Sequence, residues 1–199
     1  MANVRALHAV ADGLAMHLTR AYPTALSEDI PATFVALSTG TLHAAFNDSA
    51  NTRITVWPYR TSINEHHRNL SFAAPQGLSN RPLPLDVHLL VSVWASTVEA
   101  ELTLFAWTLR ELYQLSVLDG AVLSSIDAEF GPGEQLQLTP MELSLEDLMR
   151  LWDGVKPGYR LSAAFVARVL HIDITQADAQ PVVARRLRFT DDVAPGGPA

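Results

Sequence analysis

The chain has 199 residues, a formal net charge of −7 and a sequence pI near 5.4, and it contains no cysteine. The length suits one domain, and the lack of cysteine excludes a disulfide framework, a thiolate zinc site and a cysteine nucleophile. The acidic balance argues against a nucleic-acid binder, which needs a basic face. Because only 18% of the residues are charged, against roughly 25% in an average soluble domain, we expect apolar surface that contacts partners.

The N-terminal sequence MANVRALHAVADGLAMHL has no continuous apolar stretch of the kind found in a signal peptide, since Asp12 and two histidines interrupt it. No run approaches the roughly 18 to 20 apolar residues that span a bilayer. We therefore expect a cytoplasmic protein that does not insert into a membrane.

The first part of the chain predicts a helix followed by a short strand. Apolar residues recur at three- and four-residue steps over residues 4–21, Asn3 can cap this helix, and Pro23 ends it. A polar bridge, SEDIP, leads to a strand over residues 33–39. Residues 40–52 are rich in Asn, Asp, Ser and Gly, which predicts an irregular connection.

A β-rich segment and a central strand come next. Residues 53–62 predict a strand that lies at a sheet edge or carries a bulge, because Pro58 lacks a backbone donor. Residues 63–81 predict a long loop. In residues 81–94, RPLPLDVHLLVSVW, one face is apolar with period two and the other is partly apolar. This pattern is typical of a strand inside a sheet covered by helices.

A helix follows the central strand. Ser96 and Glu99 have the spacing of a capping box. One apolar stripe of the helix is formed by Leu102, Phe105, Leu109 and Leu112, and further apolar residues lie outside it, so we expect a helix buried on more than one side. Residues 122–126 fit a strand or a helix equally well.

The last third predicts strand, helix and strand. Residues 136–143 are strand-like, with an interruption at Pro140. Ser144 and Asp147 cap a short helix that stops at Gly154. Residues 159–174 carry the longest β pattern of the chain.

These elements predict an α/β (α+β) fold. We expect a mixed β-sheet of about four to six strands flanked by two or three helices. Residues 1–175 form the domain, and residues 176–199 form a C-terminal arm with a Pro/Gly tail.

Motifs that carry chemistry are scarce. There is no glycine-rich phosphate loop and no G-x-S-x-G nucleophile motif. The best metal candidates are Asp86 and His88, two apart on the central strand, with His66 or His67 of the long loop. The simpler interpretation, which we favour, is that Asp86 and His88 are a hydrogen-bonded polar pair and that the two loop histidines are surface residues.

Aromatic and basic residues suggest contacts instead. Trp57, Trp94, Trp107 and Trp152 fall at core positions, although Trp57, next to Pro58 and Tyr59, also fits an exposed contact patch. In the arm, arginines are interleaved with apolar residues, which fits either a solvated run of charges or docking on an acidic neighbouring subunit. The arm residues concerned are Arg185, Arg186, Arg188 and Phe189.

Several segments, taken in order, resemble the tail-terminator, or cap, proteins of extracellular contractile injection systems, whose N-terminal domain is a family in its own right. The segments are an L-D-x-H-L-L strand, an L-S-x-E-[ED]-L-x-x-L-W helix, a P-x-Y-R-L-S strand and a V-x-[LV]-x-x-Y-R-x-x-x-N-x-x-x-R-N pattern. The matching residues are Leu85, Asp86, His88, Leu89 and Leu90; Ser144, Glu146, Asp147, Leu148, Leu151 and Trp152; Pro157, Tyr159, Arg160, Leu161 and Ser162; and Val56, Tyr59, Arg60, Asn64, Arg68 and Asn69. The resemblance covers about residues 3 to 175.

The resemblance implies a structural protein with no catalysis and no cofactor. It implies a homohexameric ring on the last layer of inner tube and sheath, which ends their polymerisation and joins them, and which is incorporated into the particle. An open sheet edge over residues 53–62 or 160–169 can accept a strand from a sheath subunit. The candidate contacts with tube, sheath or neighbouring subunits are therefore Trp57, Tyr59, Arg60, Arg160, Arg168, Arg185, Arg186, Arg188 and Phe189.

Two other functions stay open at this point. One is a metal-dependent enzyme that uses Asp86 and His88 with His66 or His67, and the other is an assembly adaptor or chaperone of the same particle.

Overall fold

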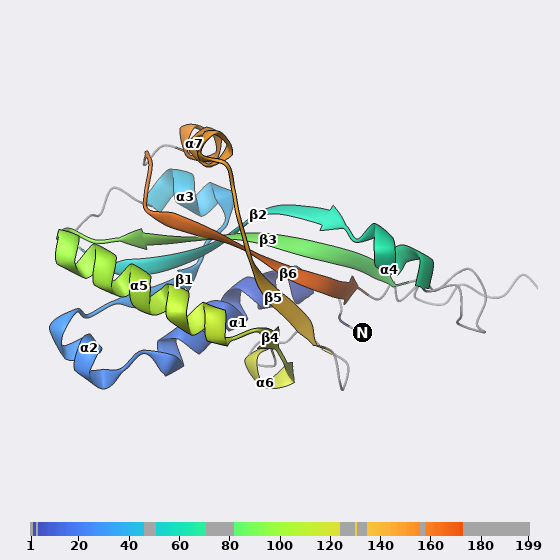
Figure 1. The fold of residues 1–199 in the computed structure, drawn as a ribbon, viewed down its shortest axis with the longest axis horizontal. Helices are drawn as coiled ribbons and strands as arrows, with labels where there is room; N and C mark the ends of the chain where they lie inside the picture. The colour runs from blue at the N-terminus through green and yellow to red at the C-terminus, as the bar shows by residue number, and fades with distance from the viewer. Residues whose placement is uncertain are drawn as a thin grey trace, which may run out of the picture.

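A six-stranded mixed sheet organises the fold (Figure 1), in the order β1-β2-β3-β6-β5-β4. The computed structural model describes residues 2, 4–45, 51–70, 82–123, 130, 135–155 and 158–172. The strands are β1 (Thr33–Ala36), β2 (Arg53–Ile63), β3 (Leu83–Trp94), β4 (Val117–Leu118), β5 (Leu136–Met141) and β6 (Ser162–Ile172). The predicted fold class and strand number are confirmed.

The predicted central strand is β3, which pairs antiparallel with β2 on one side and with β6 on the other. Only the β1–β2 pair is parallel among the strand pairs that the structure describes. Residues of β3 are buried on both faces of the sheet, Leu89 on one and Leu90 on the other. The predicted strand is therefore apolar on both faces because both faces are buried, as expected.

The described residues form seven helices, where two or three were expected. The three that match predicted helices are α1 (Ala6–Ala21), α5 (Val98–Gln114) and α7 (Leu145–Asp153), and the others are α2 (Thr24–Asp29), α3 (Thr39–Ala45), α4 (Glu65–Leu70) and α6 (Gly120–Leu123). The extra helices have four to seven residues, which is too short for an amphipathic period to appear in the sequence. Tertiary contacts hold such short helices, as where Leu42 of α3 is buried against Trp57.

One face of the sheet, here called the inner face, carries the main core. α1, α5 and α6 cover it, with Leu14, Leu104 and Leu123 fully buried. α1 and α6 approach closely at Gly13, where an added Cβ would lie 2.9 Å from the carbonyl oxygen of Val122.

The opposite, outer face is covered by α3 and α7 over one half only. A second core lies there, formed by Leu42, Trp57, Leu90, Trp94, Trp152, Val155 and Ala164. Trp57 is only 7% exposed, so its interpretation as an exposed contact patch is wrong. The core role predicted for Trp94, Trp107 and Trp152 is confirmed.

Helix caps and buried faces differ in detail from the sequence prediction. Thr97, not Ser96, caps α5, and its hydroxyl accepts from the Ala100 N–H at 3.3 Å. The most buried side of α5 contains Leu104, Trp107, Thr108 and Leu112, whereas Leu102 of the predicted stripe is exposed. The Ser144 cap of α7 is confirmed by its bond from the Asp147 N–H at 3.1 Å.

Proline and bulges shape the long strands. The pairing of β2 with β3 shifts between Pro58 and Arg60, which confirms the predicted bulge. β5 continues through Pro140, because β4 pairs only with Leu136 and Gln137 and makes no demand on a donor at Pro140.

Candidate functional site

The half of the outer face that α3 and α7 leave uncovered is polar. Its side chains come from three adjacent strands: Tyr59, Arg60 and Ser62 on β2, Asp86 and His88 on β3, and Arg168 on β6. Arg60 lies opposite His88 in the register, and Arg60 and Arg168 are both exposed. We call Arg60, His88 and Arg168 the arginine patch.

Asp86 holds a bulge in β6. The pairing of β3 with β6 shifts next to Asp86, and Val169 in the bulge has φ +68°, a left-handed conformation that is unfavourable for a β-branched residue. The Asp86 carboxylate accepts the Val169 N–H at 3.0 Å. It also accepts from the Asn64 amide nitrogen at 3.1 and 3.2 Å. These bonds explain a carboxylate at this position structurally.

His88 is bonded to β2 and not to Asp86, so the predicted hydrogen-bonded pair of Asp86 and His88 is wrong. Its Nε2 lies 3.0 Å from the Ser62 hydroxyl, and its Nδ1 is buried with no hydrogen-bond partner among the described residues. Burial lowers the pKa of His88 below its ordinary value, and the charges of Arg60 and Arg168 lower it further, while Asp86 opposes them. The ring is therefore held neutral near pH 7.

The predicted metal set is not assembled by the described residues, which contain no group of three or more His, Asp or Glu able to hold an ion. The His67 ring lies against His171, with ring centroids 5.9 Å apart, and the His67 N–H is bonded to the Asn64 side chain at 3.1 Å. His66 is exposed on α4.

The edge of β2 that points away from β3 is open along part of its length. β1 pairs with β2 only as far as Val56, and no strand of the described part of the chain pairs with that side of residues 58–63. Six residues of open strand measure about 20 Å. The alternative edge, residues 160–169, is wrong, because β6 pairs with β3 on one side and with β5 on the other.

The predicted contact residues that the structure describes gather on the outer face. Tyr59, Arg60 and Arg168 lie on its uncovered half, and Trp57 lies beneath α3. Arg160 is half-buried, with its guanidinium carbon 4.9 Å from the centre of the Trp94 ring. Its side chain therefore packs on Trp94 rather than pointing freely into solvent. Arg185, Arg186, Arg188 and Phe189, and the predicted boundary at residue 175, lie outside the described residues.

A second surface, on α5, was missed by the sequence analysis. Val98 and Tyr113, at the two ends of the helix, are 71% and 74% exposed, and Leu102 is also exposed. Together with the half-buried Phe105 and Leu109, these residues recur at steps of three and four and form one stripe, here called the α5 stripe. This spacing was visible in the sequence, but it was attributed to core packing.

The α5 stripe runs into a groove beside β5. Leu109 and Tyr113 of α5 line it on one side. On the other side it is lined by Pro140, Met141 and Phe165, with Leu143 before α7 and Leu148 of α7. Contiguous exposed apolar residues of this kind mark surfaces that contact partners or ligands.

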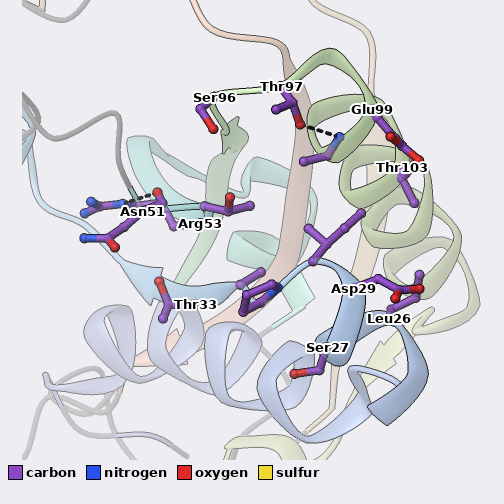
Figure 2. Close-up of a pocket in the computed structure, with 15 residues that line it drawn as sticks. Leu26, Ser27, Asp29, Thr33, Asn51, Arg53, Ser96, Thr97, Glu99 and Thr103 are labelled. Atoms are coloured by element: carbon purple, nitrogen blue, oxygen red, sulfur yellow. Dashed lines mark hydrogen bonds between the residues drawn. The ribbon is translucent and has the colours of Figure 1, made fainter.

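A hollow of about 1050 Å³ opens where α2, the start of β2 and the start of α5 meet (Figure 2). Figure 2 shows Arg53 on one wall and Asp29 and Glu99 on the opposite one. Because its walls carry charges of both signs, this hollow does not favour a ligand of one charge.

Comparison of the whole sequence with known protein families agrees with a protein whose surfaces contact partners. The sequence matches the Pvc16 N-terminal domain over residues 9–185. The chain belongs to the Pvc16 N-terminal domain family. No curated protein matches this member of the family.

Solved structures similar to this Pvc16 N-terminal domain include a terminator and a cap. One is the sheath/tube terminator of the extracellular contractile injection system PVC in its extended state, with a TM-score of 0.56 and 15% identity over 94% of this chain. The match covers 64% of that protein, so the chain spans slightly less than two thirds of its length. Another is the tube-terminating cap of the anti-feeding prophage, with a TM-score of 0.47, 15% identity, and coverage of 74% of this chain and 52% of that one.

Within the described residues of this Pvc16 N-terminal domain, none of the helices is both long and apolar enough to cross a membrane.

Proposed function

We propose that this protein is a structural cap of a contractile injection system, which forms a ring at the distal end of tube and sheath, ends their polymerisation and joins them. The observation that carries the proposal is the match to the Pvc16 N-terminal domain over residues 9–185. The shared fold with a sheath/tube terminator supports it, and so do the open edge and the α5 stripe. The role requires no catalysis and no cofactor.

The α5 stripe is the surface that we assign to contacts between subunits. A closed ring, a homohexamer in this proposal, needs a heterologous interface in which one patch meets a different patch of the next copy. The α5 stripe and the adjoining groove offer an apolar strip of the kind that forms the centre of such an interface. The arm residues Arg185, Arg186, Arg188 and Phe189 add a contact with the neighbouring subunit.

The open edge of β2 is the surface that we assign to the sheath. An extended arm of a sheath subunit adds to residues 58–63 as a further strand, with main-chain hydrogen bonds supplying the affinity. The lack of a backbone donor at Pro58 limits pairing at the start of this edge, so that the added strand lies over residues 59–63. The ring then offers no tube-like surface on its far side, and growth stops.

Assembly with and without the protein tests this function. Particles assembled with the wild-type chain should have uniform length and show the protein at the distal end by cryo-electron microscopy, whereas particles without it should be overlong or unstable. If the protein affects tail length but is absent from the finished particle, the function is that of an assembly adaptor or chaperone.

The ring is tested separately by mass photometry. Leu102→Glu, which places a charge in the middle of the α5 stripe, should convert the ring to smaller species, while the exposed control Thr103→Glu should leave the mass unchanged. Deletion of residues 181–199 should weaken the ring and its binding to the tail. An intact hexamer with unaltered tail binding would exclude a role for the arm.

A further inference from the structure

The arginine patch carries positive charge that no ion pair neutralises within the described part of the chain. The whole chain has a net charge of −7, yet neither Arg60 nor Arg168 forms an ion pair with any residue that the structure describes. Both are exposed on the same half of the outer face. They lie on β2 and β6, with β3 between them, and Arg168 is two residues along β6 from Val166, the residue opposite His88, so their backbones are about 12 Å apart.

The carboxylates that face this region are already engaged. Asp86 accepts from Asn64 and from the Val169 N–H, as described above. The charge of Asp147, at the start of α7, acts on Tyr59, and its carboxylate accepts from the Ser144 hydroxyl at 2.7 Å. The lowered pKa of His88, to which both arginines contribute, keeps this residue from adding a third charge near pH 7. The donors to Asp86 are uncharged, so they do not cancel its charge, which acts on His88 against the charges of the two arginines. Asp86 is half-buried, whereas Arg60 and Arg168 are exposed, so the two arginines are the charges of this region that face a partner.

The open edge of β2 lies directly beside the patch, since Arg60 is one of its residues. In a strand added to residues 59–63, every second side chain would point to the outer face. Those side chains would lie next to Arg60, where opposite charges on neighbouring strands attract. The same extended segment would present its other side chains toward the inner face.

We propose that the open edge of β2 selects an extended acidic segment, whose alternate carboxylates pair with Arg60 on the neighbouring strand and are attracted at longer range by the charge of Arg168. The partner is a peptide strand rather than a nucleic acid, because the edge strand offers main-chain donors and acceptors that pair with another peptide backbone. This inference rests on the proposed function and names the chemistry of the sheath arm that the edge receives.

Peptide binding to the full-length protein tests the proposal. The probes are three fluorescein-labelled nonapeptides: one alternating valine with glutamate, one alternating valine with lysine, and the glutamate peptide with N-methylated backbone at alternate residues. Fluorescence anisotropy measures the affinity for the wild type, for Arg60→Glu/Arg168→Glu, and for Arg20→Glu/Arg110→Glu. The last variant is the matched control, because Arg20 and Arg110 are exposed on helices and give the same change in net charge.

The wild type should bind the glutamate peptide and bind the lysine peptide at least tenfold more weakly. Arg60→Glu/Arg168→Glu should reverse this order, while the control variant keeps the wild-type order. N-methylation should abolish binding, because it removes the backbone donors that pair with the edge. Circular dichroism and a thermal melt confirm that each variant is folded.

Equal affinity for the two charged peptides, no binding of the glutamate peptide up to 1 mM, or an equal loss in both arginine variants would overturn the proposal. Unchanged binding of the N-methylated peptide would overturn its strand-addition part. If the peptides show no charge preference but tail length still depends on the protein, this inference fails and the capping function stands. If the charge preference is present but tail length does not depend on the protein, the capping function fails instead.

Discussion

Replacing Asp86 with alanine should destabilise the protein by about 2–3 kcal/mol, because its carboxylate bonds two donors that hold the bulge in β6. The Val169 N–H and the Asn64 amide both donate to it, at 3.0 Å and at 3.1 and 3.2 Å. A hydrogen bond to a charged group contributes about 1.5–3 kcal/mol. We take the low end for each, since Asp86 is half-buried and water replaces part of the loss.

The bulge itself supplies a sharper test. Val169 has φ +68°, and a left-handed conformation costs an L-residue about 1–2 kcal/mol. Val169→Gly removes this cost, so the bulge should persist even without the hydrogen bond from the main-chain N–H of residue 169 to Asp86. Asp86→Ala should therefore cost about 1 kcal/mol less in the Val169→Gly background than in the wild type.

Urea unfolding followed by the fluorescence of the buried tryptophans measures these differences, at one protein concentration because ring assembly contributes to stability. For a chain of this length the loss corresponds to a fall in Tm of about 5–10 °C. The control is Glu146→Ala, which removes an exposed ion pair with Arg150 and should cost less than about 0.5 kcal/mol. Two results would refute the conclusion that Asp86 holds the bulge. One is a loss of less than about 1 kcal/mol for Asp86→Ala, and the other is strict additivity of the stability changes of Asp86→Ala and Val169→Gly.

Two further predictions concern packing and pH. Gly13→Ala should lower stability by about 1–3 kcal/mol, because the new Cβ would lie 2.9 Å from a main-chain carbonyl oxygen of α6. Gly40→Ala, whose nearest neighbour is 3.9 Å away, should be neutral or stabilise α3 by up to about 1 kcal/mol; similar Tm changes for both variants would contradict the close approach. Since the pKa of His88 is lowered in the fold, the unfolded chain binds more protons below the ordinary value of 6.5, and the wild type should lose stability as the pH falls below that value. His88→Gln should flatten the dependence of stability on pH in this range, while the neighbouring charges of Arg60, Arg168 and Asp86 stay in place. If the Tm of the variant and of the wild type change in parallel between pH 7.5 and 5.5, His88 does not contribute.

Long elements with a complete apolar period were predictable from the sequence. The alternation in β3, the amphipathic pattern of α1 and the Ser144 cap of α7 each involve residues close in sequence, whose spacing reports directly on local geometry. Pro58 was equally informative, since a residue without a backbone donor restricts a strand wherever it occurs.

The candidate surfaces were only partly predictable. Tyr59, Arg60 and Arg168 were singled out, but their position on the same half of the outer face depends on the order β2-β3-β6, which joins segments more than a hundred residues apart. The α5 stripe was visible as a spacing and was assigned to the core, because amphipathicity alone does not tell which of two apolar sides of a helix is covered.

By itself the sequence determined the fold class, the central strand and the family, because composition, periodicity and an ordered set of motifs can be recognised without knowing which residues are in contact. The tertiary structure decided which strand edge is open, which face α3 and α7 cover, and what Asp86 bonds. These properties depend on pairs of residues distant in the chain, such as Asp86 with Val169 and Val56 with Ala36. Only the folded sheet brings such pairs together, and only then do burial and hydrogen bonding separate a structural carboxylate from a catalytic one.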